Sequence, residues 1–242
     1  MIGLGTVINT AGVVGGGFVG LLLKKGLNEK IQQGLTMACG LGAMFIGISG
    51  TVAKMLTFEN GKFNTQGSML LVISLIIGSL TGELLKIEDL FDSLGERLKK
   101  AAKRESDNSF VETFVNVSLI ICVGAMAIVG SIQDGVSGDW TMLATKGLLD
   151  AIIVMVFAST GGVGAIFSAI PVFVLQGSVT AIAAFAGSFL TQGMTDGIGF
   201  VGSALVFCVG INICFGKKFR VANMVPAIFV PVIYELMANF VK

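Results

Sequence analysis

Two residues of opposite charge, Lys146 and Asp150, stand alone in a stretch that has no other charged side chain from Trp140 to Thr195. Four residues apart, they would lie on one face of a helix. A charge at the centre of a bilayer costs at least about 2.5–3.5 kcal/mol on insertion scales, so it is expected to have a function or a partner. We take Asp150 as a coupling or binding group for a proton, a cation or a substrate charge. A purely structural ion pair with Lys146 is the alternative.

Neutral polar residues follow this pair along the chain. Ser159 and Thr160 precede the glycine-rich run 161–164, and Ser168 and Gln176 come after it. A helix break here would expose backbone groups that can coordinate an ion or a solute. A tight turn at the membrane surface would give the same pattern, so both interpretations stay open.

Two further candidates come from other apolar stretches. Asn9 lies in the first stretch, where an amide serves either a ligand or a hydrogen bond between helices. Gln133, followed by Asp134 and Asp139, would make an acidic mouth at the outer side or an ordinary polar loop.

The sequence lacks the residues that several kinds of chemistry require. The chain has no histidine and only four cysteines, none of them in a CxxC pair, so no metal site or cofactor is expected. No nucleophile–base pair and no phosphate loop is visible, which makes an enzyme the least favoured class. A net charge of +1, with the basic residues mostly in loops, also argues against nucleic-acid binding.

The elements that position these residues are long apolar segments. Hydrophobic residues make up 54% of the 242-residue chain and charged residues only 13%, so the bilayer is the expected surrounding. A bilayer core requires roughly 20 apolar residues per helix. The sequence therefore predicts a single domain of about eight transmembrane helices, an all-α integral membrane protein, with spans near 2–23, 35–55, 67–85, 113–133, 140–159, 165–190, 197–216 and 221–241.

The positions of the basic residues in the loops test this order of spans. With eight spans, the loops that follow spans 1, 3 and 7 lie on one side, and they hold twelve of the sixteen lysines and arginines. Because cytoplasmic loops carry the excess of positive charge, this side is expected to be the cytoplasm and both termini are expected outside. The longest of these loops, 86–110, has apolar residues at helical spacing and predicts an amphipathic helix on the inner membrane surface.

The chain has 34 glycine residues, and some of them recur at the same spacing in two regions. The Gly16-x-x-x-Gly20 pair recurs as Gly78-x-x-x-Gly82, and the run 42–46 resembles 124–128. Helices 1–2 and helices 3–4 are thus expected to be a duplicated two-helix unit. Small residues at such spacing let helix backbones approach closely in lipid.

Five stretches together resemble a known family. They are GTVIN at 5–9, GSIQDG at 130–135, TKGLLD at 145–150, SAIPV at 168–172 with Gln176-Gly177, and RVAN at 220–223. They resemble the bacterial YqgA/YdfK-like membrane proteins, a domain of unknown function (DUF554), over nearly the whole chain. The resemblance implies a bacterial inner membrane protein with a role in transport, without naming a substrate.

Three functions remain in competition. The first is a transporter of a small solute or ion that uses Asp150, and the second is a channel, which could be a homo-oligomer. The third is a membrane protein that acts through partners docking on the basic loop 86–104.

Overall fold

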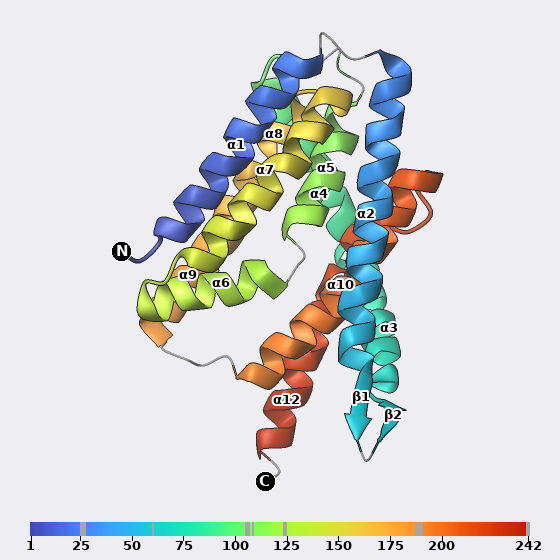
Figure 1. Ribbon diagram of the computed structural model, residues 1–242, viewed down its shortest axis with the longest axis vertical. Coiled ribbons are helices and arrows are strands. Elements are labelled where there is room, and N and C mark those ends of the chain that lie inside the picture. Colours follow the sequence, from blue (N-terminus) through green and yellow to red (C-terminus); the bar gives the residue numbers. More distant parts are fainter. Residues whose placement is uncertain are drawn as a thin grey trace.

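Most of the chain folds into helices because its apolar runs are long and suit lipid. In lipid a helix pairs its backbone groups within itself. The computed structural model describes residues 1–24, 28–59, 61–104, 107, 109–122, 125–186 and 191–240 (Figure 1). The elements are α1 (Leu4–Lys24), α2 (Glu29–Met55), β1 (Leu56–Glu59), β2 (Lys62–Thr65), α3 (Ser68–Leu85), α4 (Ile87–Ala101), α5 (Phe110–Cys122), α6 (Ala125–Ser137), α7 (Thr141–Gly161), α8 (Gly164–Phe167), α9 (Ala169–Ala186), α10 (Gln192–Phe215), α11 (Val221–Met224), η1 (Val225–Phe229) and α12 (Val230–Phe240).

The fold class predicted from the sequence is confirmed. Within the part of the chain that the structure describes, seven helices are long and apolar enough to cross a membrane, and the bent pair α5–α6 makes eight if it forms one span. Large apolar side chains on the outside of the helices are widely exposed, among them Phe45, Ile76 and Phe185. Such surfaces suit lipid rather than water.

The expected continuous span over 113–133 needs correction. Its place is taken by two helices, α5 and α6, whose axes differ by 73°. Because α6 turns away, it lies along α9 and reaches the beginning of α1. The break also leaves the last carbonyls of α5 without partners in their own helix.

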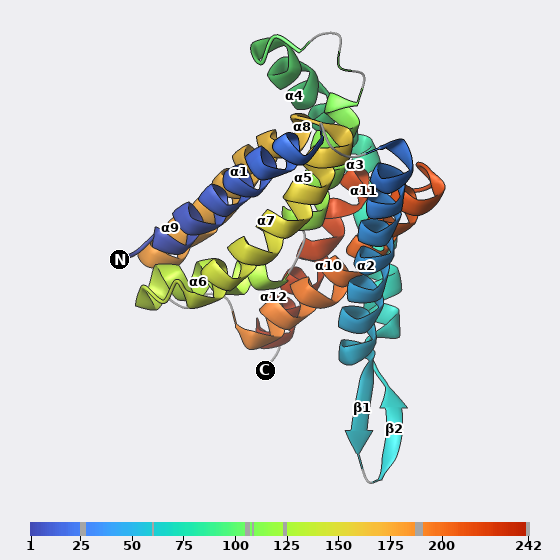
Figure 2. The same cartoon turned by 45° about the horizontal axis from the view of Figure 1, so that its top comes forward.

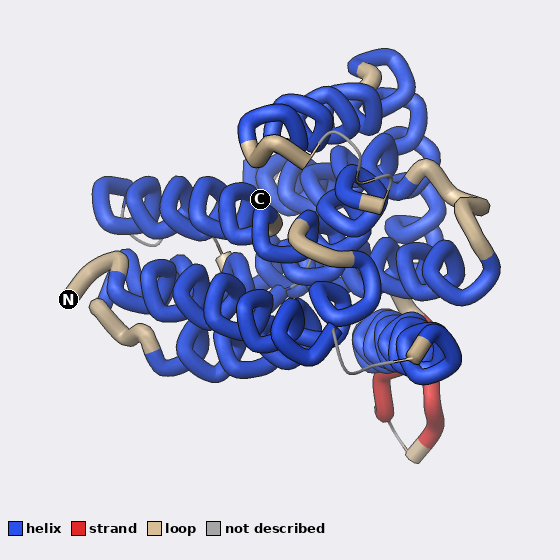
Figure 3. The backbone as a smooth tube through the Cα atoms, turned by 90° about the horizontal axis from the view of Figure 1, so that it is seen from above, coloured by secondary structure: helices blue, strands red, loops and turns tan. Residues whose placement is uncertain are grey.

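A short antiparallel hairpin, β1–β2, follows α2 and lies between the spans predicted at 35–55 and 67–85. Phe58 and Phe63 lie opposite each other on it, with ring centroids 5.0 Å apart. In Figure 3, the two strands lie at the edge of the molecule.

Two glycine-lined seams hold the longest helices together. On α1, a Cβ atom at Gly12, Gly16 or Gly20 would collide with the backbone carbonyls of Gly147, Ala151 and Met155 on α7. The matching order of the numbers shows that α1 and α7 run parallel.

The second seam joins α2 to α10. Gly40 packs on Ile213 of α10, and Gly47 packs on Phe207, so these two helices run antiparallel. Glycine at these positions permits a backbone approach that any side chain would prevent.

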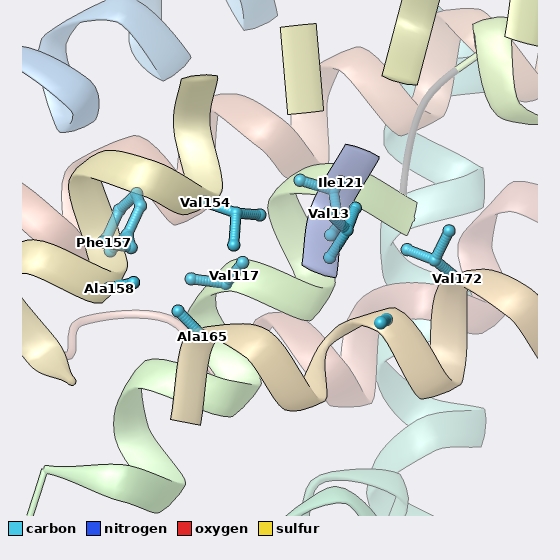
Figure 4. Packing of buried hydrophobic residues seen from close by; sticks show 9 residues of the cluster. Val13, Val117, Ile121, Val154, Phe157, Ala158, Ala165 and Val172 are labelled. Carbon is cyan, nitrogen blue, oxygen red and sulfur yellow. The ribbon is translucent and has the colours of Figure 1, made fainter. Parts of the chain in front are cut away.

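The core is divided between the two seams, with α5 between them. One cluster joins α1, α5, α7, α8 and α9, and includes Val13, Val117 and Val154 (Figure 4). A second joins α5 to α10 and α11 through Leu119 and Leu205, and a small third cluster joins α10 to η1 through Val201 and Ala227.

In Figure 2, α4 lies at the top of the molecule, away from the beginning of α1 and the end of α12. At the α4 end, the buried carboxylate of Glu88 pairs with Lys217 at 2.5 Å and with Arg220 at 3.7 Å. Arg220 also pairs with Glu83 at 2.7 Å. These ion pairs fix the first turn of α4 to the loop that follows α10. The location of α4 at a membrane surface stays a prediction.

The proposed duplication of helices 1–2 in helices 3–4 also stays a prediction. Gly16 and Gly20 pack on α7, whereas Gly78 packs on Ala227 of η1 and Gly82 on Asn223 of α11. Both glycine pairs therefore allow a close approach of helices, but they pack against different partners.

Candidate functional site

Lys146 and Asp150 are both buried on α7, with 6% and 3% of their surfaces exposed. Four residues apart on one helix face, they form an ion pair in which Lys146 Nζ lies 2.5 Å from Asp150 Oδ2. Lys146 Nζ also donates a hydrogen bond of 2.7 Å to the backbone oxygen of Ile121. That oxygen belongs to the last turn of α5, so the broken helix presents its carbonyl end to a cation in the interior.

Asn9 of α1 lies next to this pair. Its backbone packs against Gly147, and its side chain is adjacent to the Asp150 carboxylate. The Asn9 side chain is fully buried. Its amide nitrogen is near enough to the Asp150 carboxylate for a weak hydrogen bond, and no described residue donates to its amide oxygen. A buried amide of this kind is unfavourable unless something else satisfies it.

Gln176 of α9 occupies the same level of the molecule. The helices α1 and α9 are antiparallel, and Thr6 meets Thr180 across them at 3.4 Å. One turn further on, this register brings Gln176 to the level of Asn9. Gln176 is also buried, and its amide nitrogen and oxygen have no partner among the described residues.

A cavity of about 430 Å³ borders the ion pair, and we call it the inner cavity. It is open on one side, because its lining residues Ile46, Leu149 and Ile152 are 61%, 49% and 50% exposed. Lys146 and Asp150 lie on its α7 side, and the other walls are mostly apolar side chains of α2, α5 and α10. Cys39 and Ser203 are its other polar residues. Gln176 is not among the described residues that line it, so the two buried amides of α1 and α9 do not form one open chamber with the ion pair.

A second cavity, of about 680 Å³, lies between the same four helices at the α4 end, and we call it the vestibule. Its polar residues come from three helix ends and include Gln33, Glu112, Asn116 and Thr160. Phe157 lines both cavities and is 5% exposed, so its ring lies where they meet. Phe157 is two turns of α7 from Asp150, roughly 10 Å along the helix axis.

The hydroxyl groups predicted near the glycine run satisfy their own helices. Ser159 donates to the backbone oxygen of Val156 at 2.7 Å, and Ser168 donates to Ala165 at 2.6 Å. Thr160 bonds to the same turn of α7 and lines the vestibule. These three residues lie at the α4 end and are not gathered around Asp150.

The glycine run itself is a turn at the end of α7. Gly162 has φ of 90° and ends the helix, and Lys24 and Asp107 lie beside it. The structure therefore has a tight turn between α7 and α8, away from the ion pair, and the position of this turn at a membrane surface stays a prediction.

Gln133 lies near the opposite end, on α6. Its neighbour Asp134 is fully buried and accepts hydrogen bonds from the backbone amides of Gly3 and Gly5. Asp134 therefore caps α1 and does not contribute to an acidic mouth, which corrects that expectation.

Sequence reasoning missed three parts of the site. These are the backbone carbonyl of Ile121, the Phe157 ring and the vestibule residue Glu112. The carbonyl becomes available only because α5 ends at Cys122, and no charge or proline marks that end. Phe157 resembles any other apolar residue of its helix.

Comparison with known proteins gives a family without an assigned function. The family described as "Protein of unknown function (DUF554)" matches residues 4–236. A protein named "Uncharacterized membrane protein YdfK" from Bacillus subtilis (strain 168) is 30% identical over 227 residues, which cover 94% of this chain and 93% of that protein. "Uncharacterized protein YqgA" from Escherichia coli (strain K12) is 28% identical over 229 residues, covering 93% of each chain. No solved structure matches the chain. The extent of these matches, with the helical fold, places the chain in the DUF554 family of membrane proteins.

Proposed function

We propose that this protein is a carrier that moves a small solute or ion across the bacterial inner membrane, with the Lys146–Asp150 pair as its binding and coupling group. The observation that carries the proposal is the pair of cavities that meet at Phe157, one bordering the buried ion pair and the other at the α4 end. Together they line a path between α2, α5, α7 and α10.

The charge of the site limits how a carrier can work. The pair is neutral as a whole, and most of the inner cavity wall is apolar. An added ion of either sign would leave a net charge in a medium that solvates it poorly. Binding of an anion is therefore expected to accompany protonation of Asp150.

A carrier fits this arrangement better than a channel. A channel requires a continuous opening in one conformation, whereas the two cavities are separate and Phe157 is the one described residue that lines both. A carrier exposes its site to one side at a time, so closures within the path are part of its cycle.

The orientation follows from charge. The end that holds α4, Lys24 and the loop after α10 carries most of the basic residues. We assign this end to the cytoplasm, which leaves both termini outside.

The test is flux in proteoliposomes that contain a pH-sensitive dye. Alkali chlorides, small carboxylates and amino acids are added one at a time under an imposed pH gradient. At least one of these solutes is expected to change the internal pH in a saturable way. Asp150→Asn is expected to abolish this response.

The matched control is Lys54→Met with Asp196→Asn, which removes another lysine–aspartate pair with both side chains more than 40% exposed. This variant should transport like the wild type. Equal flux in Asp150→Asn and the wild type would refute the carboxylate's role, and unitary current steps in a planar bilayer would favour a channel.

A further inference from the structure

The inner cavity opens on the outer face of the helix bundle, between α2 and α7. Ile46 of α2 and Leu149 and Ile152 of α7 line it and are exposed. The neighbouring side chains Phe45 and Leu148 are exposed as well. All five are apolar, and they lie near the middle of two helices that are long and apolar enough to cross a membrane. At this depth the opening is expected to face hydrocarbon rather than water.

The inside of the inner cavity is also apolar. Apart from the ion pair, Cys39 and Ser203 are the polar side chains among the described residues that line it. Its volume of about 430 Å³ falls among ligand pockets of about 300–1,000 Å³. At about 30 Å³ for each heavy atom, it has room for roughly a dozen of them. A ligand that fits such walls is mostly hydrocarbon.

The Lys146 ammonium has a hydrogen-bond donor left for a ligand. An ammonium group has three N–H donors. Two of them have partners, Asp150 Oδ2 at 2.5 Å and the carbonyl oxygen of Ile121 at 2.7 Å. Among the described residues, the third has no partner, and Lys146 lines the inner cavity. An anionic group in the cavity would accept a charge-assisted hydrogen bond from it.

We propose that the inner cavity binds an amphipathic anion with one hydrocarbon chain, which enters from the bilayer between α2 and α7 and places its head group at Lys146. The inference rests on the proposed carrier function and names the substrate class of the same site. The hydrocarbon chain lies against the apolar walls and points to the opening. A proton on Asp150 keeps the occupied site neutral.

The hydrogen-bonding groups around the pair favour an anionic head group over a cationic one. The Asp150 carboxylate already accepts from Lys146, and the Asn9 amide lies beside it. The capacity that remains on the cavity side is therefore a donor. The thiol of Cys39 and the hydroxyl of Ser203 are further donors in the cavity wall.

The vestibule provides the other half of a route for such a molecule. Its lining includes the polar side chains of Gln33, Asn116 and Thr160. A head group that moves from Lys146 past Phe157 would reach these polar surroundings at the α4 end. An anionic head group crosses the hydrocarbon core of a bilayer only at a high free-energy cost, so this route would replace an unfavourable step.

The experiment uses decane sulfonate that carries a photoreactive diazirine on its chain. The purified full chain in lipid nanodiscs is irradiated with this probe, and mass spectrometry locates the labelled residues. Labelling is expected on residues that line the inner cavity. An excess of unlabelled decane sulfonate should reduce this labelling severalfold, whereas decanol and decyltrimethylammonium, which have the same chain, should leave it unchanged.

Two variants at neighbouring positions test the opening. Leu149→Trp narrows the mouth of the cavity and should reduce the labelling severalfold. Leu148→Trp is the matched control, because Leu148 is exposed on the same helix and does not line the cavity, so it should label like the wild type. Lys146→Met removes the donor and should abolish the labelling that decane sulfonate displaces. Thermal unfolding of each variant checks that it remains folded, and the Leu149→Trp result does not depend on Lys146→Met.

The outcomes distinguish this inference from the carrier function. Decanol that displaces the probe as well as decane sulfonate does would overturn recognition of the anionic head group. Equal labelling of Leu149→Trp and Leu148→Trp would overturn entry between α2 and α7. If the cavity is labelled as expected but neither decane sulfonate nor another solute shows flux in proteoliposomes, the binding site stands and the carrier is refuted. If Asp150-dependent flux of another solute is found while the cavity is not labelled, the substrate class is refuted and the carrier stands.

Discussion

The carboxylate of Asp134 caps α1: its Oδ2 atom accepts a hydrogen bond of 3.0 Å from the amide of Gly5, 129 residues earlier in the chain. Its other oxygen accepts one of 3.1 Å from Gly3. The first amides of α1 have no partner within their own helix, so this buried carboxylate satisfies two of them.

Asp134→Ala should lower the free energy of unfolding by about 2–4 kcal/mol, because two amides, one buried and one partly buried, lose a charged acceptor. Thermal unfolding in detergent measures the effect. Asp139→Ala is the control, because the exposed Asp139 side chain caps the first turn of α7 through Thr141 at 3.0 Å. If Asp134→Ala lowers the free energy of unfolding no more than Asp139→Ala does, the burial of the Asp134 carboxylate adds nothing to its effect as a cap.

The seam between α1 and α7 should tolerate no side chain at Gly16. Gly16→Ala would press a methyl group into the backbone of Ala151 and should cost about 1–3 kcal/mol of stability. Gly15→Ala is a neighbouring control, since a Cβ there meets nothing within 4 Å. The control should be neutral or slightly stabilising, because alanine favours helix more than glycine does. Equal unfolding temperatures for the two variants would refute the close contact.

Removal of the Phe157 ring should join the vestibule to the inner cavity. The measurement is the rate at which a charged thiol reagent modifies Cys39, which lines the inner cavity. The other cysteines, Cys122, Cys208 and Cys214, are first replaced by serine. Phe157→Ala should raise the rate severalfold. Ile213→Ala, which enlarges only the vestibule, should leave the rate near that of the parent, and a similar rise in both would rule out a barrier at Phe157.

The environment of Asp92, at the α4 end, predicts that the stability of the protein depends on pH. Burial in the cleft beside Glu88 raises the pKa of the Asp92 carboxyl, and Lys217 opposes the shift. An acid with a raised folded-state pKa contributes most stability below its unfolded-state pKa, and this contribution is lost as the pH rises through the folded-state value. Asp92→Asn should therefore be more stable than the wild type at neutral pH, by less than about 1 kcal/mol because solvent screens the group.

Asp139 is expected to show the opposite sign. Hydrogen bonds from Thr141 lower the pKa of the Asp139 carboxyl. Its contribution is then present above the unfolded-state pKa and is lost as the pH falls through the folded-state value. Unfolding temperatures of Asp92→Asn and Asp139→Asn across acid and neutral pH test both directions, and the same trend in the two variants would contradict the assignment.

The assigned orientation can be tested with single cysteines at Lys62 and Lys99. Lys62 lies on the hairpin and Lys99 on α4, at opposite ends of the molecule (Figure 2). A membrane-impermeant maleimide should label Lys62→Cys in intact cells and Lys99→Cys only after the membrane is opened. The reverse pattern would place both termini in the cytoplasm.

Much of the fold could be predicted from local sequence, because lipid imposes long uncharged helices and an i, i+4 pair has only one face to share. This accounts for most helices and for Lys146 beside Asp150. The Asp134 cap and the Glu88–Lys217 pair could not be predicted, since their partners are more than a hundred residues apart in the chain.

The bend after Cys122 could not be predicted from the sequence either. Apolar residues continue on both sides of it, so hydropathy indicates one span where the structure has two helices. The carbonyl that contacts Lys146 exists as a free acceptor only because of that bend. The hydrogen bond from Lys146 to Ile121 therefore depends on a bend that no sequence pattern indicates.

The two glycine seams also determine which parts of the protein can move. Separating α1 from α7, or α2 from α10, would open backbone surfaces that fit each other without intervening side chains. Each pair should then shift as one rigid body. The path past Phe157 runs between these bodies, with α5 packed against both. A rocking motion about α5 would thus change access to Asp150 while leaving both seams closed.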